Sequence, residues 1–187
     1  GLGNQFLSNI REVEVILHMV RCFEDGNIIH VEGDVNPLRD IEIIETELIY
    51  ADISQLEKKI DRLKKQSKSS KEAAASLLIA EDLFKHLEEL QPVKTYENQE
   101  NEVFIALDKE LRFLSNKDVI YGANVDEDSL ADGGNKFVDL VKEHAASVNA
   151  DVILLCAKIE EELVGLSDEE ANEFLADLGV QESGLEQ

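Results

Sequence analysis

The sequence contains few residues of the kinds that staple small secreted or metal-bound domains. Among its 187 residues are two cysteines and no tryptophan, and aromatic residues make up 5% of the chain. Cys22 and Cys156 lie far apart, with no second cysteine at metal-ligand spacing. Neither a disulfide framework nor a zinc site is therefore indicated, and a reducing compartment, the cytoplasm, is the expected location.

Positive charge is also scarce, since 18 Lys and Arg stand against 41 Asp and Glu, which gives a net charge of -23. Phosphate backbones and anionic lipids attract basic surfaces, so this balance argues against sequence-specific DNA and against membranes as partners. No apolar run approaches the roughly 20 residues needed to cross a bilayer, and no signal peptide opens the chain. The chain begins with Gly1 rather than Met, so we expect it to be cut from a longer protein.

Three segments are predicted to be buried strands. Residues 118–124 form a short apolar run bounded by turn-forming residues, a pattern typical of parallel strands covered on both faces. Residues 13–20 and 152–155 show similar runs. The spacing between the second and third strands leaves room for one crossover helix. The predicted fold class is α/β, with three core parallel strands.

Between the first two strands lie two helical patterns with matching seams. Apolar residues recur at alternating four-residue and three-residue steps, as in a coiled coil. The seams are Ile49, Ile53, Leu56, Ile60 and Leu63, and Ala73, Leu77, Ala80, Phe84 and Leu87. Asn36 followed by Pro37 predicts the helix start, and Pro92 closes the pair. We expect an antiparallel coiled-coil helical hairpin, followed by an amphipathic helix over residues 98–116 that leads back to the sheet.

Residues 64–71 contain no apolar side chain and predict the exposed tip of this hairpin. The tip carries Lys64, Lys65, Lys68 and Lys71, a cationic patch on a strongly acidic chain. Two interpretations stay open for it. The patch is either a solvated turn or a contact point for RNA or for an acidic protein surface.

Polar residues follow the strand at residues 118–124. In open α/β sheets, ligands bind beyond the carboxyl ends of the strands, and here that end presents Asn124 and then Asp126 and Glu127. A strand followed by an Asn/Asp turn is common and often means only a turn. The pattern Asn124-x-x-Glu127 is therefore a weak signal by itself.

The carboxyl ends of the strands at residues 118–124 and 152–155 resemble the base-binding end of P-loop GTPases. In those proteins an Asn-Lys-x-Asp loop and a Ser-Ala-Lys loop hold guanine. In this sequence Val125 stands in place of the Lys of the first loop, and Glu127 stands in place of the Asp that recognises guanine. A carboxylate selects guanine because it accepts from N1–H and from the 2-amino group, and adenine has neither donor. Asn124 can still pair with N6 and N7 of adenine. The loop therefore favours ATP over GTP.

Five stretches of the chain, in the order in which they occur, resemble the Obg-like ATPase family of the P-loop GTPase superfamily. These stretches are residues 1–7, 18–25, 40–48, 124–127 and 156–160. The resemblance implies a P-loop domain interrupted by a helical hairpin, hydrolysis of ATP to ADP, association with ribosomes, and a cytoplasmic location. It assigns nucleotide binding to Asn124, Val125, Glu127, Cys156, Ala157 and Lys158.

In this family a phosphate loop and a metal-linked Asp-x-x-Gly segment would lie upstream of Gly1, and a β-grasp domain beyond Gln187. The resemblance implies a partial P-loop domain at 1–36, the hairpin at 37–92, and the remaining P-loop domain with the base loops at 93–187. It assigns no catalytic residue and no metal ligand to this chain. ATP is the expected substrate, and Mg²⁺ is expected only in the complete protein. Phosphoryl transfer depends on groups that position the phosphates, so the segment alone is expected to be inactive.

Two classes of function stay open. The favoured hypothesis is a nucleotide-driven switch, and the alternative is an interaction module whose hairpin recruits a partner without nucleotide turnover. A guanine-specific enzyme is disfavoured by Glu127. Because strands that would neighbour residues 13–20 are missing, the isolated segment leaves an apolar edge unpaired, and we expect it to be marginally stable or to aggregate.

Overall fold

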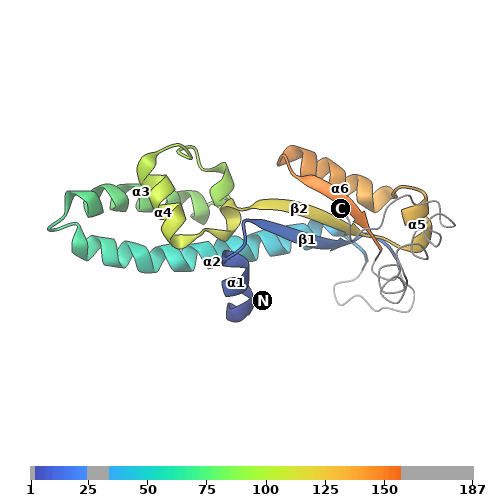
Figure 1. Cartoon of the computed structure of the whole chain (residues 1–187), viewed down its shortest axis with the longest axis horizontal. Helices are drawn as coiled ribbons and strands as arrows, with labels where there is room; N and C mark the ends of the chain where they lie inside the picture. The colour runs from blue at the N-terminus through green and yellow to red at the C-terminus, as the bar shows by residue number, and fades with distance from the viewer. Residues whose placement is uncertain (1–2, 25–33, 157–187) are drawn as a thin grey trace, which may run out of the picture. The chain divides into compact units, whose positions relative to one another are not determined.

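The computed structural model describes residues 3–24 and 34–156, and Figure 1 shows its elements. Along the chain they are α1 (Asn4–Arg11), β1 (Val15–Arg21), α2 (Pro37–Gln66), α3 (Lys71–Glu88), η1 (Val93–Thr95), α4 (Glu102–Leu111), η2 (Leu114–Asn116), β2 (Asp118–Asn124), α5 (Glu127–Ala131), α6 (Lys136–Ser147) and β3 (Asp151–Leu155). The predicted α/β class with three parallel strands is confirmed. None of the helices in the described ranges is long and apolar enough to span a membrane.

The chain divides by its internal contacts into two compact units. The helical unit comprises Gly1–Ile16 and Glu42–Asp118, and the sheet unit comprises Leu17–Ile41 and Val119–Gln187. These units are defined by contacts within the chain, which do not test the domain boundaries predicted from the sequence. The ranges that sequence analysis gave for a P-loop domain and its insertion therefore stay a prediction.

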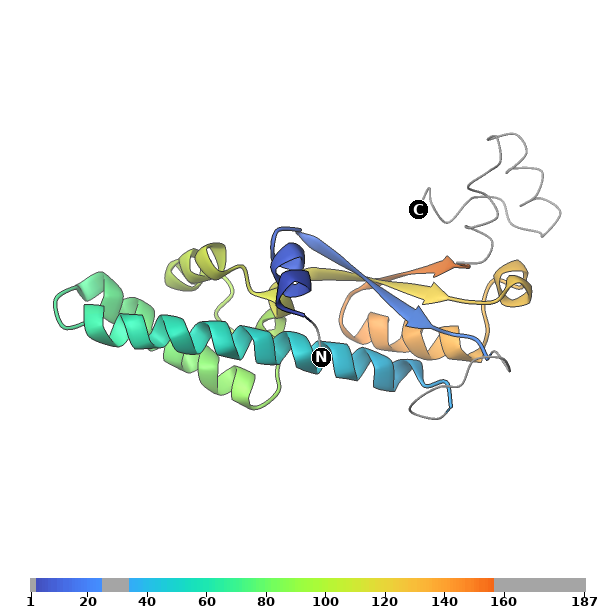
Figure 2. The same ribbon diagram turned by 90° about the horizontal axis from the view of Figure 1, so that it is seen from below.

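In the sheet unit, the strands follow the order β1-β2-β3, and β2 pairs with β3 in parallel from Ile120 opposite Asp151 to Asn124 opposite Leu155. Helix α6 forms the predicted crossover between β2 and β3 and lies along one face of the sheet (Figure 2). It buries an apolar stripe against β2, and the cluster includes Tyr121, Ala123, Val138, Val141 and Ala145. This packing fixes where the carboxyl end of β2 lies.

The opposite face of the sheet carries apolar side chains that stay exposed in the described part of the chain. Leu17 and Met19 on β1 are 51% and 46% exposed. Gly122 on β2 points to the same face, since a Cβ there would lie 2.7 Å from Met19 Sδ and 3.0 Å from Leu155 Cδ1. We call Leu17, Met19 and Leu155 the open sheet face.

In the helical unit, both predicted seams lie in one hydrophobic cluster. Seven of the ten seam residues are buried, and Ile53, Leu77 and Phe84 are partly buried against them. The seam prediction is confirmed, because a 3.6-residue helical period places these positions on one stripe. The coiled-coil geometry itself stays a prediction.

Helix α4 differs from the sequence prediction in length and in what it covers. It spans only Glu102–Leu111, because Asn101 caps its start by accepting from the backbone N–H of Val103 and Phe104, and Arg112 ends it at a φ of 52°. Its buried side chains, Phe104, Leu107 and Leu111, belong to the cluster that holds the seams of α2 and α3. The predicted helix over residues 98–116 was therefore too long, and α4 completes the core of the helical unit.

A buried carboxylate joins α2 to the turn at η2. The Asp52 side chain is 0% exposed. Its Oδ1 accepts from the Leu114 N–H at 2.9 Å, and its Oδ2 accepts from the Ser115 N–H at 2.8 Å and from Ser115 Oγ at 2.6 Å. Burial raises the pKa of Asp52 to about 6, against the lowering effect of these hydrogen bonds. Ser115 Oγ in turn accepts from the Val93 N–H at 3.0 Å.

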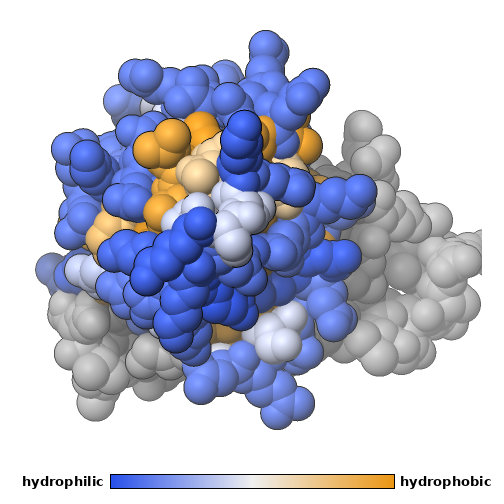
Figure 3. Space-filling view, turned by 90° about the vertical axis from the view of Figure 1, so that its left-hand side faces the viewer, coloured by the Kyte–Doolittle hydropathy of each residue, from blue (hydrophilic) through white to orange (hydrophobic). Residues whose placement is uncertain are grey.

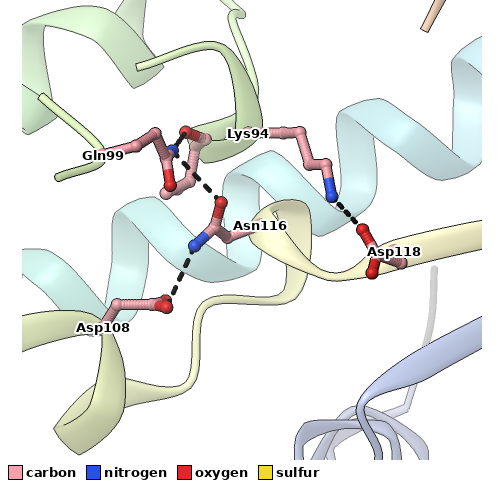
Figure 4. A network of polar contacts seen from close by, with 6 residues as sticks. Lys94, Gln99, Asp108, Asn116 and Asp118 are labelled. Carbon is pink, nitrogen blue, oxygen red and sulfur yellow. Dashed lines mark hydrogen bonds and ion pairs between the residues drawn. The ribbon is translucent and has the colours of Figure 1, made fainter. Parts of the chain in front are cut away.

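A second polar network lies in the same unit, just before β2 (Figure 4). Gln99 Nε2 donates to Asn116 Oδ1 at 3.2 Å, and Asn116 Nδ2 donates to Asp108 Oδ2 at 3.0 Å. Lys94 pairs with Asp118, the first residue of β2. These bonds tie the segments around α4 to the point where β2 begins.

Candidate functional site

The backbone at the carboxyl end of β2 is bonded on both sides. The Cys22 N–H, just after β1, donates to the Asn124 carbonyl at 2.8 Å. The Val125 N–H donates to the carbonyl of Leu155, the last residue of β3, at 2.8 Å. Asn124 is therefore held between two neighbouring strand ends, and its side chain is half-buried.

Asn135 ties the same strand ends to the loop before α6. Its Nδ2 donates to the Cys22 carbonyl at 2.7 Å and to Ser129 Oγ at 3.0 Å, while its Oδ1 caps α6. Gly133 and Gly134 precede it at φ values of 78° and 143°, which suit glycine. The sequence predicted only a loop at Asn135. The available signal was the Gly-Gly-Asn sequence directly before an amphipathic helix, a typical N-cap pattern.

The two carboxylates after Asn124 occupy different positions. Asp126 Oδ1 accepts from the Ser129 N–H at 2.9 Å and caps the short helix α5. Hydrogen bonds from Ser129 hold the pKa of Asp126 below its usual value. Glu127 is the first residue of α5 and is half-buried. Asp126 therefore serves the local fold, and the role of Glu127 in reading a base stays a prediction.

Val125 and Cys156 are buried, each with 2% of its surface exposed. The Val125 side chain packs in the sheet core. Burial, followed by the charge of Asp40, raises the pKa of the Cys22 thiol to about 12, which keeps it protonated at neutral pH. Ala157 and Lys158 lie outside the described residues.

The described residues do not form a metal centre. Within 3–24 and 34–156, no three His, Cys, Asp or Glu side chains are grouped closely enough to hold a metal ion. The expectation that the Mg²⁺ ligands lie outside this chain stays a prediction.

A comparison with solved structures shows the class of protein to which the fold belongs. The chain is similar to the solved YchF GTPase of Schizosaccharomyces pombe, with a TM-score of 0.81 and 34% identity over 97% of this chain and 50% of that one. Its fold is therefore that of the P-loop GTPases. No family model matches the chain.

Two curated relatives give the particular family. The chain is 47% identical to the ribosome-binding ATPase YchF of Bacillus subtilis over 100% of its own length and 51% of the relative's. It is 44% identical to the protein of that name from Escherichia coli O157:H7, over 99% of this chain and 50% of the relative. The chain is a homologue of YchF, and the resemblance to the Obg-like ATPases is confirmed. It spans about half the length of these relatives.

Proposed function

We propose that the complete protein binds ATP and hydrolyses it to ADP, and that this chain supplies the base-binding end of the site. The observation that carries the proposal is the position of Asn124, whose carbonyl accepts from Cys22 while the next N–H donates to Leu155. A fixed strand end can present the Asn124 amide at one place and angle. Such preorganisation lowers the entropic cost of recognising a flat base.

The chemistry of the loop favours adenine. The Asn124 amide has one acceptor and one donor group, which match N6–H and N7 of adenine. Glu127 is one methylene longer than the Asp that clamps guanine and stands where adenine offers no donor. Val125 would contact the base through its backbone, and Cys156, Ala157 and Lys158 would supply the second base-side loop. Mg²⁺ would neutralise phosphate charge in the complete protein, with ligands outside this chain.

The same proposal places the complete protein on ribosomes in the cytoplasm. Support comes from the names of the Bacillus subtilis and Escherichia coli relatives, which state ribosome binding and ATPase activity. The nucleotide would then act as a switch for that association.

The alternative function is an interaction module built on the hairpin, without nucleotide turnover. One observation favours it. The helical unit has its own hydrophobic cluster, which includes Leu56, Ala80, Leu87 and Phe104, so it could hold a partner surface without any nucleotide.

Replacing Asn124 with alanine in the full-length protein distinguishes the ATPase from the interaction module. We expect the Asn124→Ala variant to lose about tenfold or more of its preference for ATP over GTP, because an unpaired polar edge of the base is left in the site. Glu127→Asp is expected to shift the preference towards GTP. Titration calorimetry with ATP and GTP measures both, and Asn9→Ala, on the exposed surface of α1, is the control.

The adaptor hypothesis gives a different pattern. If Asn124→Ala and wild type bind ATP and GTP with the same affinities, or neither binds a nucleotide, the proposed base site is wrong. Unchanged co-sedimentation with ribosomes in that case would favour the interaction module.

A further inference from the structure

The turn between α2 and α3 concentrates positive charge on a chain of the opposite sign. Residues 58–71 hold seven basic residues and one acidic residue, although the whole chain carries a net charge of -23. They are Lys58, Lys59, Arg62, Lys64, Lys65, Lys68 and Lys71, with Asp61. All the basic side chains except the half-buried Lys59 are exposed. Figure 3 looks onto this end of the helical unit and shows mostly hydrophilic side chains, with a smaller hydrophobic group among them. We call residues 58–71 the basic tip.

The basic tip is ordered by its own hydrogen bonds. The Ser67 N–H donates to the Leu63 carbonyl at 2.8 Å, and the Ser69 N–H donates to the Gln66 carbonyl at 3.1 Å. Ser70 Oγ caps α3 by accepting from the Ala73 N–H at 3.2 Å. Since Leu63 and Ala73 also belong to the core of the unit, the lysines project from a backbone that is already in place. A ligand that binds them does not have to order the turn.

A pocket of about 270 Å³ opens among α2, α3 and α4 beside this turn. Its apolar wall includes Leu63 and Leu107, and its polar wall includes Gln66, Ser76, Glu72 and Glu110. The volume is below the range of pockets that take drug-sized ligands. An apolar wall beside amide, hydroxyl and carboxylate groups suits a single flat heterocycle whose faces are apolar and whose edge is polar.

We propose that the pocket takes an unpaired nucleotide of an RNA strand and that the lysines of the basic tip hold the adjoining phosphates. Single-stranded RNA is recognised through bases splayed out of the strand, while lysine acts as a point charge for phosphate. The carboxylate of Glu72 can accept from an exocyclic amino group of a base. An acidic protein surface would place no flat ring against the apolar wall formed by Leu63 and Leu107, so RNA is the favoured occupant.

The charges in and beside the pocket are compatible with an anionic RNA strand. Lys59 Nζ pairs with Glu110 Oε2 at 2.8 Å, which neutralises one of the two carboxylates. The remaining basic side chains of the tip outnumber Glu72 and Asp61. The choice of RNA rests on the proposed ribosome association.

The test uses the full-length protein and a labelled single-stranded RNA of about ten nucleotides, within the site sizes of single-strand binders. Fluorescence anisotropy measures its affinity at about 50 and about 200 mM salt. Ala106→Phe fills the pocket from the exposed surface of α4 without changing charge, and Ser76→Phe fills it from α3. Ala75→Phe is the matched control, because Ala75 is exposed on α3 outside the pocket.

We expect both pocket-filling variants to weaken RNA binding about tenfold, because one base is excluded from the pocket at a loss of about 1.4 kcal/mol, and Ala75→Phe to bind as wild type. The double change Lys65→Glu and Lys68→Glu should weaken binding and lower its salt dependence, whereas Lys85→Glu, exposed at the far end of α3, should not. Duplex RNA of the same length should bind more weakly than the single strand.

Three results would overturn the proposal. The first is wild-type affinity in both pocket-filling variants that keep the wild-type melting temperature, and the second is equal binding of single-stranded and duplex RNA. The third is competition by poly-glutamate as strong as by RNA, which would point to an acidic protein surface. ATP affinity and ribosome co-sedimentation are measured in the same samples. If wild type retains both but binds no RNA, this inference fails while the proposed function stands.

Discussion

Replacing Asp52 with alanine is expected to lower the free energy of unfolding by about 3 kcal/mol or more, because hydrogen bonds to charged groups contribute about 1.5 to 3 kcal/mol each and buried donors are left unpaired. The carboxylate is fully buried and accepts from the Leu114 N–H and from both donors of Ser115. Alanine leaves these groups without an acceptor. Chemical denaturation followed by circular dichroism measures the change.

Asp61→Ala is the matched control, since Asp61 lies on the same helix with its side chain exposed. It should change the stability by at most about 0.5 kcal/mol, as surface substitutions usually do. Equal stability of Asp52→Ala and Asp61→Ala would show that the turn at η2 is not held by Asp52.

The same residue gives a dependence on pH. The pKa of Asp52 rises from 3.8 to about 6 on folding, so the folded protein holds this proton more tightly than the unfolded chain. The contribution of Asp52 to stability is therefore full below pH 3.8 and falls as the pH rises through about 6. Asp52→Asn does not titrate. The stability of wild type relative to Asp52→Asn should rise by about 3 kcal/mol when the pH is lowered across this range, at about 1.4 kcal/mol per pKa unit.

The second large effect concerns the open sheet face. The 187-residue chain by itself is expected to self-associate in sedimentation velocity, with a sedimentation coefficient that rises with concentration. Leu17 and Met19 are about half exposed on an outer strand, and exposed apolar strands are templates for association. The double change Leu17→Lys and Met19→Lys should move the chain towards monomer.

Leu78→Lys serves as the control, because Leu78 is 73% exposed in the helical unit and not on the sheet. It should leave the self-association unchanged. A chain that stays monomeric at all concentrations and melts cooperatively would contradict both this expectation and the open sheet face as its cause.

Local patterns predicted the elements well. The seams of α2 and α3 were visible because a helix repeats its buried side chains every three to four residues, and Asn36 does cap α2, accepting from the Arg39 N–H at 3.1 Å. The predicted length of α4 was wrong. An N-cap at Asn101 and a left-handed backbone conformation at Arg112 end the helix, although the apolar pattern continues on both sides.

Contacts between distant residues could not be predicted. Asp52 bonds to a turn 62 residues away, and Asn135 bonds to Cys22 across 113 residues. Nothing near either residue in the sequence marks its partner. The strand end at Asn124 was predicted from the buried run before it, whereas the burial of Val125 against α6 depends on how the chain returns to the sheet.

The measurement that tests the central claim most directly is titration calorimetry of ATP and GTP on the intact protein purified from its own cells. The account predicts that ATP binds at least about tenfold more tightly than GTP, a difference of about 1.4 kcal/mol, and that the bound protein turns ATP over to ADP. Tighter binding of GTP, or binding of neither nucleotide, would contradict it.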